Sequence, residues 1–200
     1  GGAVFIAWHP SGLIDPMLMM ATLPGKMSLI AKHTLFKMPI LGTIMRASGA
    51  LPIMRSSDVK GDGDDSKKHN ENQLSLVAEA VARGGKLIIF PEGTTHSESD
   101  VKRVRTGTAR IMEMAIEQSE NEGLAPPSLI PVGLHYSEAH TFRERAAVIV
   151  ERPMDLPALP ERSGDAAADE TERRTWVKGV TSDIENELKR ASHATSSWQN

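Results

Sequence analysis

The stretch "VFIAWHPSGLIDPM", residues 4–17, joins an apolar run to a histidine, a Pro-Ser-Gly turn and an Asp-Pro pair. An apolar run of this length followed by turn residues predicts a buried strand that ends just before His9. The Asp-Pro pair is typical of a helix start, where Asp15 can cap the free backbone N–H groups. A second interpretation stays open, because the same carboxylate can accept a hydrogen bond from the His9 ring.

Strand candidates recur along the chain and alternate with helical patterns. Short apolar runs lie at 3–8, 28–31, 50–54, 86–90, 129–136 and 146–150. The spacing of apolar residues predicts helices over about 71–83, 106–120 and 171–190. This alternation predicts the α/β class, as a single domain with a largely parallel mixed sheet flanked by helices.

The length and composition of the chain indicate one compact domain, with 200 residues of which 40% are hydrophobic. We expect a core over 1–155, a linker over 156–170, and a C-terminal helix and tail over 171–200 that pack on or beside the core. Residues 56–70 are polar, rich in Gly and Asp, and without periodicity. This composition predicts an exposed loop. The spacing of the acidic residues does not fit a calcium-binding loop.

Charge and cysteine content exclude several classes of function. The formal net charge is −3, from 23 basic and 26 acidic residues, so we expect no nucleic-acid partner. The absence of cysteine excludes disulfides, thiolate metal sites and thiol nucleophiles, and with no His-Glu-x-x-His motif we expect no metal. No apolar run reaches the roughly 18 residues of a membrane span, which predicts a soluble chain. Because a strand-like run begins almost at residue 1, a missing upstream membrane anchor stays an open alternative.

Polar residues follow several of the predicted strands at the point where each strand ends. His9 follows the first strand, Lys32 the second and Arg55 the third, while Glu92 lies in the turn after the fourth. Ligands bind beyond the carboxyl ends of the strands in an open parallel sheet, so we expect these groups to meet at one edge. An imidazole exchanges protons near neutral pH, Asp15 can fix its tautomer, and the two cations favour an anionic substrate such as a phosphate ester. Taken singly, each cation is more often a solvated surface charge.

Four stretches, in this order, resemble the motifs of the glycerolipid acyltransferase family, which esterifies glycerol phosphates and lysophospholipids from acyl thioesters. They are "HPSGLIDP" (9–16), "KHTLFKMPILGTIMRASGALPIMR" (32–55), "IIFPEGTTH" (88–96) and "LIPVGLHY" (129–136). The resemblance covers about residues 4–152 and implies the same α/β fold. Five residues separate His9 from Asp15 where four are more common, which resembles the branch of yeast-type glycerol phosphate acyltransferases and many bacterial relatives.

The resemblance also implies roles for individual residues. His9 would be the general base and Asp15 its partner, while Arg55, together with Lys32, would contact the phosphate of the acceptor. The arginine that usually follows the threonine of the third motif is absent here, so another cation would contact the phosphate. The candidates are Lys102, Arg103 and Arg105. The residues implied to shape the acceptor pocket are Glu92, Gly93, Thr94 and His96.

The implied activity is direct transfer of a fatty acyl group in phospholipid biosynthesis, without a further cofactor. The donor would be acyl-CoA or acyl-carrier protein, and the acceptor glycerol-3-phosphate or 1-acylglycerol-3-phosphate. The apolar segment 33–49, which carries Lys37 and Arg46, predicts contact with a membrane surface, on the cytoplasmic side. Two alternatives stay open: a lipid or thioester hydrolase, and a non-catalytic lipid-binding module. The first is not a serine hydrolase of the Gly-x-Ser-x-Gly type, since that motif is absent.

Overall fold

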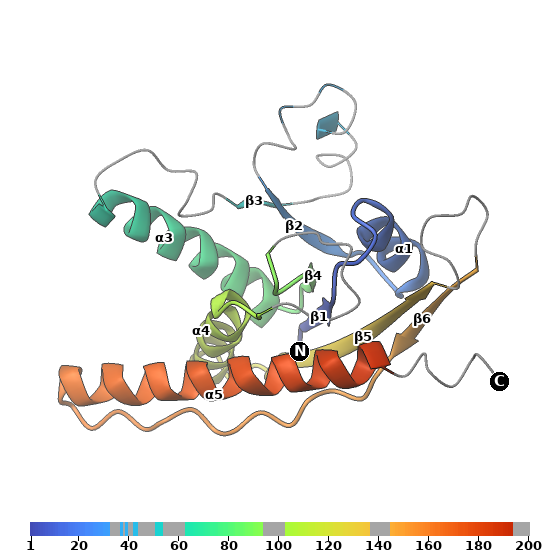
Figure 1. Ribbon diagram of the computed structural model, residues 1–200. Helices are drawn as coiled ribbons and strands as arrows, with labels where there is room; N and C mark the ends of the chain where they lie inside the picture. The colour runs from blue at the N-terminus through green and yellow to red at the C-terminus, as the bar shows by residue number, and fades with distance from the viewer. Residues whose placement is uncertain are drawn as a thin grey trace.

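Strands and helices alternate along the chain as the apolar patterns predict (Figure 1). The structure, a computed structural model, describes residues 1–32, 37, 39, 42–43, 51–53, 63–93, 103–136 and 145–193, and for 31–32, 51–53, 63–70 and 193 it describes the backbone alone. The strands are β1 (Ala3–Ala7), β2 (Ser28–Lys32), β3 (Leu51–Ile53), β4 (Lys86–Ile89), β5 (Ser128–Tyr136) and β6 (Ala146–Val150). The helices are α1 (Ile14–Thr22), α3 (Gly63–Ala82), α4 (Gly107–Asn121) and α5 (Ala166–His193).

The described strands form one six-stranded sheet in the order β3-β2-β4-β1-β5-β6. All neighbours are parallel except β5 and β6, which confirms the predicted largely parallel mixed sheet. Phe5 at the centre of β1 lies opposite Ile88 of β4 and Ile130 of β5, so these three strands point toward the same edge. Ala7, the last residue of β1, pairs with Val132, and β5 continues beyond it to Tyr136. The end of β5 therefore projects past the edge at which β1 stops.

Both faces of the sheet are covered, which explains why the strands are continuous apolar runs rather than alternating ones. Successive side chains of a strand point to opposite faces. Val4 and Ile6 pack against α3, α4 and α5, whereas Phe5 and Ala7 pack on the face that α1 covers, through Met19. In Figure 1, α1 lies on the opposite side of the sheet from the other three helices. We call these the α5 face and the α1 face.

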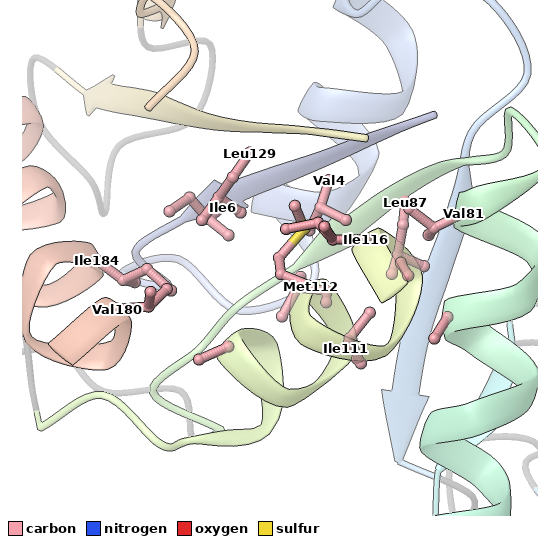
Figure 2. Close-up of a cluster of buried hydrophobic side chains, with 14 of the residues drawn as sticks. Val4, Ile6, Val81, Leu87, Ile111, Met112, Ile116, Leu129, Val180 and Ile184 are labelled. Atoms are coloured by element: carbon pink, nitrogen blue, oxygen red, sulfur yellow. The ribbon is translucent and has the colours of Figure 1, made fainter. Parts of the chain in front are cut away.

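The larger core lies on the α5 face (Figure 2). Met112 of α4 and Ile184 of α5 are completely buried and belong to the same cluster as Ile6 and Leu87 of the sheet. Full burial of such a side chain stabilises the fold by about 1.5–3 kcal/mol. The predicted inward faces of the helices are also buried: Leu74, Val77, Ala78 and Val81 on α3, and Val177, Val180, Ile184 and Leu188 on α5.

Helix α3 begins earlier than the sequence predicts. Its backbone is helical from Gly63, so the prediction of a loop is wrong for 63–70, while 56–62 lies outside the described residues. Asp64 and Asp65 occupy the first turn, where negative charge favours the N-terminal end of the helix dipole. The residues of these first turns are polar, so they give no hydrophobic periodicity to detect.

Helix α5 also begins earlier, at Ala166 rather than near 171. Asp165 caps it, because its Oδ1 accepts a hydrogen bond from the backbone N–H of Ala167 at 2.9 Å. The preceding segment, 151–165, runs without regular structure beside α5 (Figure 1), and Trp176 Nε1 donates to the backbone O of Pro157 at 3.1 Å. No helix in the described ranges has both the length and the apolar character needed to cross a membrane.

Candidate active site

His9 leaves the sheet at the carboxyl edge, two residues after β1 ends, and three neighbours fix it there. Trp8 Nε1 donates to the backbone O of Leu134 at 3.0 Å, which holds the chain against β5. The backbone N–H of His9 donates to Glu92 Oε2 at 3.2 Å. The imidazole stacks on the Phe90 ring, with the centroids 4.2 Å apart and the planes 21° from parallel. Backbone and ring plane of His9 are therefore both set by residues that follow β4.

The chain turns sharply between His9 and α1. Gly12 has a φ of 61°, in the left-handed region that glycine adopts without steric cost. The backbone N–H of Ile14 donates to the carbonyl of Ser11 at 3.3 Å, which closes the turn. The turn places Asp15 in the first turn of α1, on the helix side that faces the sheet together with Met19.

The carboxylate of Asp15 is completely buried and accepts three hydrogen bonds. His9 Nδ1 and the backbone N–H of Ser11 both lie 2.8 Å from Oδ2. The Tyr136 hydroxyl donates to Oδ1 at 2.6 Å. The interpretation of Asp15 as a helix cap is wrong, because Leu13 occupies the N-cap position and makes no side-chain cap bond.

The His9–Asp15 contact determines what the imidazole can do. An ionised carboxylate can only accept hydrogen bonds, so the shared proton sits on Nδ1 of the imidazole. Nε2 then carries the lone pair and is the atom left for a substrate. The His9 side chain is 17% exposed, in contrast to its buried partner. This arrangement can remove a proton from a hydroxyl group that reaches Nε2.

The turn after β4 brings a buried acid and an exposed cation to the same place. Glu92 is 2% exposed and holds the His9 backbone, as described above. Gly93 has a φ of 67°, and a Cβ on it would lie 3.1 Å from Arg105 Nε. The Arg105 backbone N–H donates to the carbonyl of Pro91 at 3.0 Å. The exposed Arg105 side chain therefore lies across Gly93, next to the residue that touches His9.

The sequence predicts no site role for two residues that the structure places beside His9 and Asp15. It predicts Phe90 as the end of a strand and Tyr136 as the end of the fourth motif. Burial, reinforced by the hydrogen bond to Asp15, raises the pKa of Tyr136 well above its ordinary value. The available signal was position, since both residues lie at the carboxyl ends of strands that flank β1. The sequence could not identify Asp15 as the partner of Tyr136, because that contact joins residues far apart in the chain.

Several predicted site residues are not placed. Lys32 is the last residue of β2, at the same edge of the sheet, and the structure describes its backbone but not its side chain. Arg55, Thr94, His96 and Lys102 lie outside the described residues, as does most of 33–49. The structure thus brings together His9, Asp15, Glu92 and Gly93. Within the described ranges, no cluster of three or more His, Asp or Glu side chains could hold a metal ion.

Comparisons with known proteins show which sequences and folds this chain resembles. A family model described as Acyltransferase matches residues 1–135. An uncharacterized acyltransferase of Schizosaccharomyces pombe is 29% identical over 106 residues, which is 53% of this chain and 14% of the relative. Glycerol-3-phosphate O-acyltransferase 1 of Saccharomyces cerevisiae is 27% identical over 81 residues, which is 40% of this chain and 10% of the relative. The chain thus spans a small part of each of these proteins.

A solved structure has the same fold. The crystal structure of the 1-acyl-sn-glycerophosphate (LPA) acyltransferase PlsC from Thermotoga maritima superposes with a TM-score of 0.50 at 16% sequence identity. The match covers 92% of this chain and 66% of that one. At this identity the likeness concerns the fold, and it confirms the predicted single α/β domain.

Proposed function

The chain belongs to the acyltransferase family, and from that premise we propose that it transfers a fatty acyl group to a hydroxyl of a glycerophosphate. The donor is acyl-CoA or acyl-carrier protein, and the acceptor is glycerol-3-phosphate or its 1-acyl derivative. The names of the Saccharomyces relative and of the Thermotoga structure support this acceptor class. The reaction would be a step in phospholipid biosynthesis.

The chemistry rests on His9 as the general base. Nε2 takes the proton of the acceptor hydroxyl while the hydroxyl oxygen attacks the thioester carbonyl. The new ester C–O bond forms, the C–S bond breaks, and the imidazolium returns its proton to the departing thiolate. Asp15 holds Nδ1–H throughout and stabilises the imidazolium that forms. The observation that carries the proposal is the 2.8 Å contact of Nδ1 with a buried carboxylate, which leaves Nε2 for the substrate.

The phosphate of the acceptor needs a cation near this base. Arg105 supports that role, because its side chain crosses Gly93 beside the residue that holds His9. A guanidinium can bind a phosphate through two parallel N–H···O bonds. Lys32 and Arg55, at or after the ends of neighbouring strands, are proposed as further phosphate ligands, and Thr94 and His96 as parts of the acceptor pocket.

The central experiment measures product and thiol release together. The protein is incubated with a labelled acyl-CoA, or the same acyl group on acyl-carrier protein, and with glycerol-3-phosphate, 1-acylglycerol-3-phosphate or no acceptor. We expect an acylated glycerophosphate and thiol release that depends on the acceptor. His9→Ala should lower this rate by about 10²–10⁴-fold while circular dichroism stays unchanged.

The same experiment distinguishes the alternatives. Thiol release that is equal with and without acceptor would indicate a hydrolase. Binding of the acyl donor by calorimetry without any product would indicate a lipid-binding module. Full turnover by a folded His9→Ala variant would reject the assignment of the base.

A matched pair of arginine variants tests the phosphate contact. Arg103 is exposed and lies near Glu185 of α5, whereas Arg105 lies across Gly93. Arg105→Gln should raise the KM for the phosphate-bearing acceptor about 10–100-fold and leave the KM for the acyl donor unchanged, because a charged hydrogen bond contributes about 1.5–3 kcal/mol. Arg103→Gln should leave both values unchanged. Equal effects of the two substitutions would exclude a specific role for Arg105.

We also propose that the protein works at a membrane surface, where its lipid substrates reside. Leu13, Ile14 and Met17 are large, exposed apolar side chains around the start of α1, beside Asp15. Replacing all three with serine should weaken sedimentation with vesicles of anionic phospholipid. Leu76 and Leu124 are exposed elsewhere, so their replacement with serine is the control. If both sets bind vesicles as the wild type does, the start of α1 does not contact the membrane.

A further inference from the structure

The three donors to Asp15 are distributed unequally between its two oxygens. His9 Nδ1 and the Ser11 backbone N–H both bind Oδ2, each at 2.8 Å. Oδ1 receives the Tyr136 hydroxyl at 2.6 Å. The torsion that turns a carboxylate about its Cβ–Cγ bond is intrinsically soft. Two donors on one oxygen fix the position of that oxygen, and a donor on the other oxygen fixes the plane.

The geometry and protonation of the Tyr136 hydroxyl suit a hydrogen-bond donor to Asp15. The O···O distance lies in the range of a charge-assisted O–H···O⁻ bond. The raised pKa of Tyr136 keeps its hydroxyl protonated throughout the physiological pH range. Its half-buried ring packs on the core of the α1 face, and this packing fixes the position of the hydroxyl.

The register of the sheet explains why this residue reaches Asp15. β5 continues from Val132 to Tyr136 after β1 has ended at Ala7. Its final residue therefore lies beyond the edge of the sheet, level with the turn that leads into α1. β6 pairs with this same end of β5, from Val132 to Tyr136, and supports the projecting segment from its other side.

We propose that Tyr136 is a positioning residue for the acyl transfer, and that it fixes the Asp15 carboxylate in the plane that lets Oδ2 orient the His9 ring. The inference rests on the proposed function, and it assigns to the last residue of β5 a role in the reaction. Tyr136 acts through Asp15 and has no contact with the substrate in this role. Among the described residues, Glu92 is a further ionisable group in contact with the pair, through the His9 backbone.

Tyr136→Phe tests the proposal, because it keeps the ring and removes the hydroxyl. We expect kcat to fall about 10–100-fold, as when the partner that orients a functional side chain is lost, while the KM for both substrates stays unchanged. The acidic limb of the kcat profile should move to higher pH, since an anionic pair that loses a donor holds its proton more tightly. The matched control is Ser119→Ala, which removes a buried hydroxyl and its 2.8 Å bond to the Ile116 carbonyl in α4. This control should lower the melting temperature without moving the pH profile.

The outcomes separate the inference from the function on which it rests. An active wild type whose Tyr136→Phe variant keeps its kcat, or keeps the acidic limb in place, would overturn the positioning role alone. A wild type that forms no acylated product would overturn the proposed function, and the inference with it.

A spectroscopic measurement covers the case in which Tyr136→Phe fails to fold. Tyr136 is the only tyrosine of the 200 residues, so tyrosinate absorbance reports on it directly. We expect no tyrosinate at the ordinary midpoint near pH 10 while the protein remains folded. Ionisation of the folded protein at that midpoint would show that the hydroxyl is not held by Asp15, and would reject the inference.

Discussion

Neighbouring residues of β5 point to opposite faces of the sheet and differ in their hydrogen bonding. On the α1 face, Tyr136 completes the hydrogen bonds of the buried Asp15. On the α5 face, His135 is buried with neither ring nitrogen bonded to any described residue. Gly133 leaves room for this ring, since a Cβ there would lie 2.7 Å from His135 Nε2 and 3.0 Å from the backbone O of Ala191 in α5.

The difference leads us to expect separate tasks for the two faces. A buried polar group normally has its hydrogen bonds satisfied, as the Asp15 carboxylate has on the α1 face, although the buried Ser11 Oγ in the turn beside it has no partner among the described residues. The α5 face is held mainly by apolar packing of three helices, and it tolerates an unsatisfied imidazole. We therefore expect substitutions on the α1 face to change the reaction, and those on the α5 face to change stability.

The largest effect is expected for Asp15→Asn, which keeps the shape of the side chain and removes its charge. An amide in place of the carboxylate favours the wrong imidazole tautomer, so kcat should fall by about 10²–10⁴-fold with the fold retained. The matched control is Glu113→Gln on the α5 face, another buried carboxylate, which pairs with Arg173. The control should lose stability to urea but keep its kcat. Comparable losses of kcat in both variants would remove the distinction between the faces.

The next effect is a loss of stability without a loss of turnover. Ile184 is completely buried in the α5-face core, and Ile184→Ala should lower the free energy of unfolding by about 2–5 kcal/mol. At temperatures where the variant is folded, its kcat should match the wild type. Leu76 is exposed on α3, so Leu76→Ala should change neither quantity. A large drop of kcat in folded Ile184→Ala would mean that the two faces are coupled.

The smallest effect concerns the pH dependence of stability. Burial lowers the pKa of His135, with Glu151 opposing part of the shift. The folded protein therefore keeps this ring neutral, and below about pH 6.5 the unfolded chain binds the extra proton. Above that pH, His135 does not reduce the free energy of unfolding. As the pH falls below it, protonation of the unfolded chain lowers this free energy. His135→Leu should flatten the decline in unfolding free energy between about pH 7 and pH 5, because the variant has no imidazole to protonate in the unfolded chain. Parallel curves for the variant and the wild type would contradict this.

Much of the fold could be predicted because both faces of the sheet are buried at β1, β4 and β5. Each strand is then a short apolar run, and the six predicted strands all occur in the sheet. The starts of α3 and α5 could not be found from apolar periodicity, since the residues that begin α3 are polar and α5 begins at the cap formed by Asp165. Electrostatic and capping signals are local, and they are easily taken for the composition of a loop.

Part of the site was predictable where its residues follow strands in the sequence. His9 and Glu92 were predicted in this way, Asp15 was predicted as the partner of the His9 ring, and the structure brings the three together. Tyr136 was not, because its contact with Asp15 depends on how far β5 outruns β1, which is a property of sheet register. The roles of Lys32, Arg55, Thr94 and His96 stay predictions.

The rotation of α1 about its own axis is set by its packing, and this has a consequence for the turn before it. Asp15 and Met19 are one helical turn apart on the same buried side of α1. The packing of Met19 in the core therefore also sets the direction of the Asp15 carboxylate. A rotation by one residue, about 100°, would expose Met19 and turn Asp15 away from His9 together. Changes in the number of residues between His9 and Asp15 must therefore be absorbed around Gly12, while the helix keeps its angular setting.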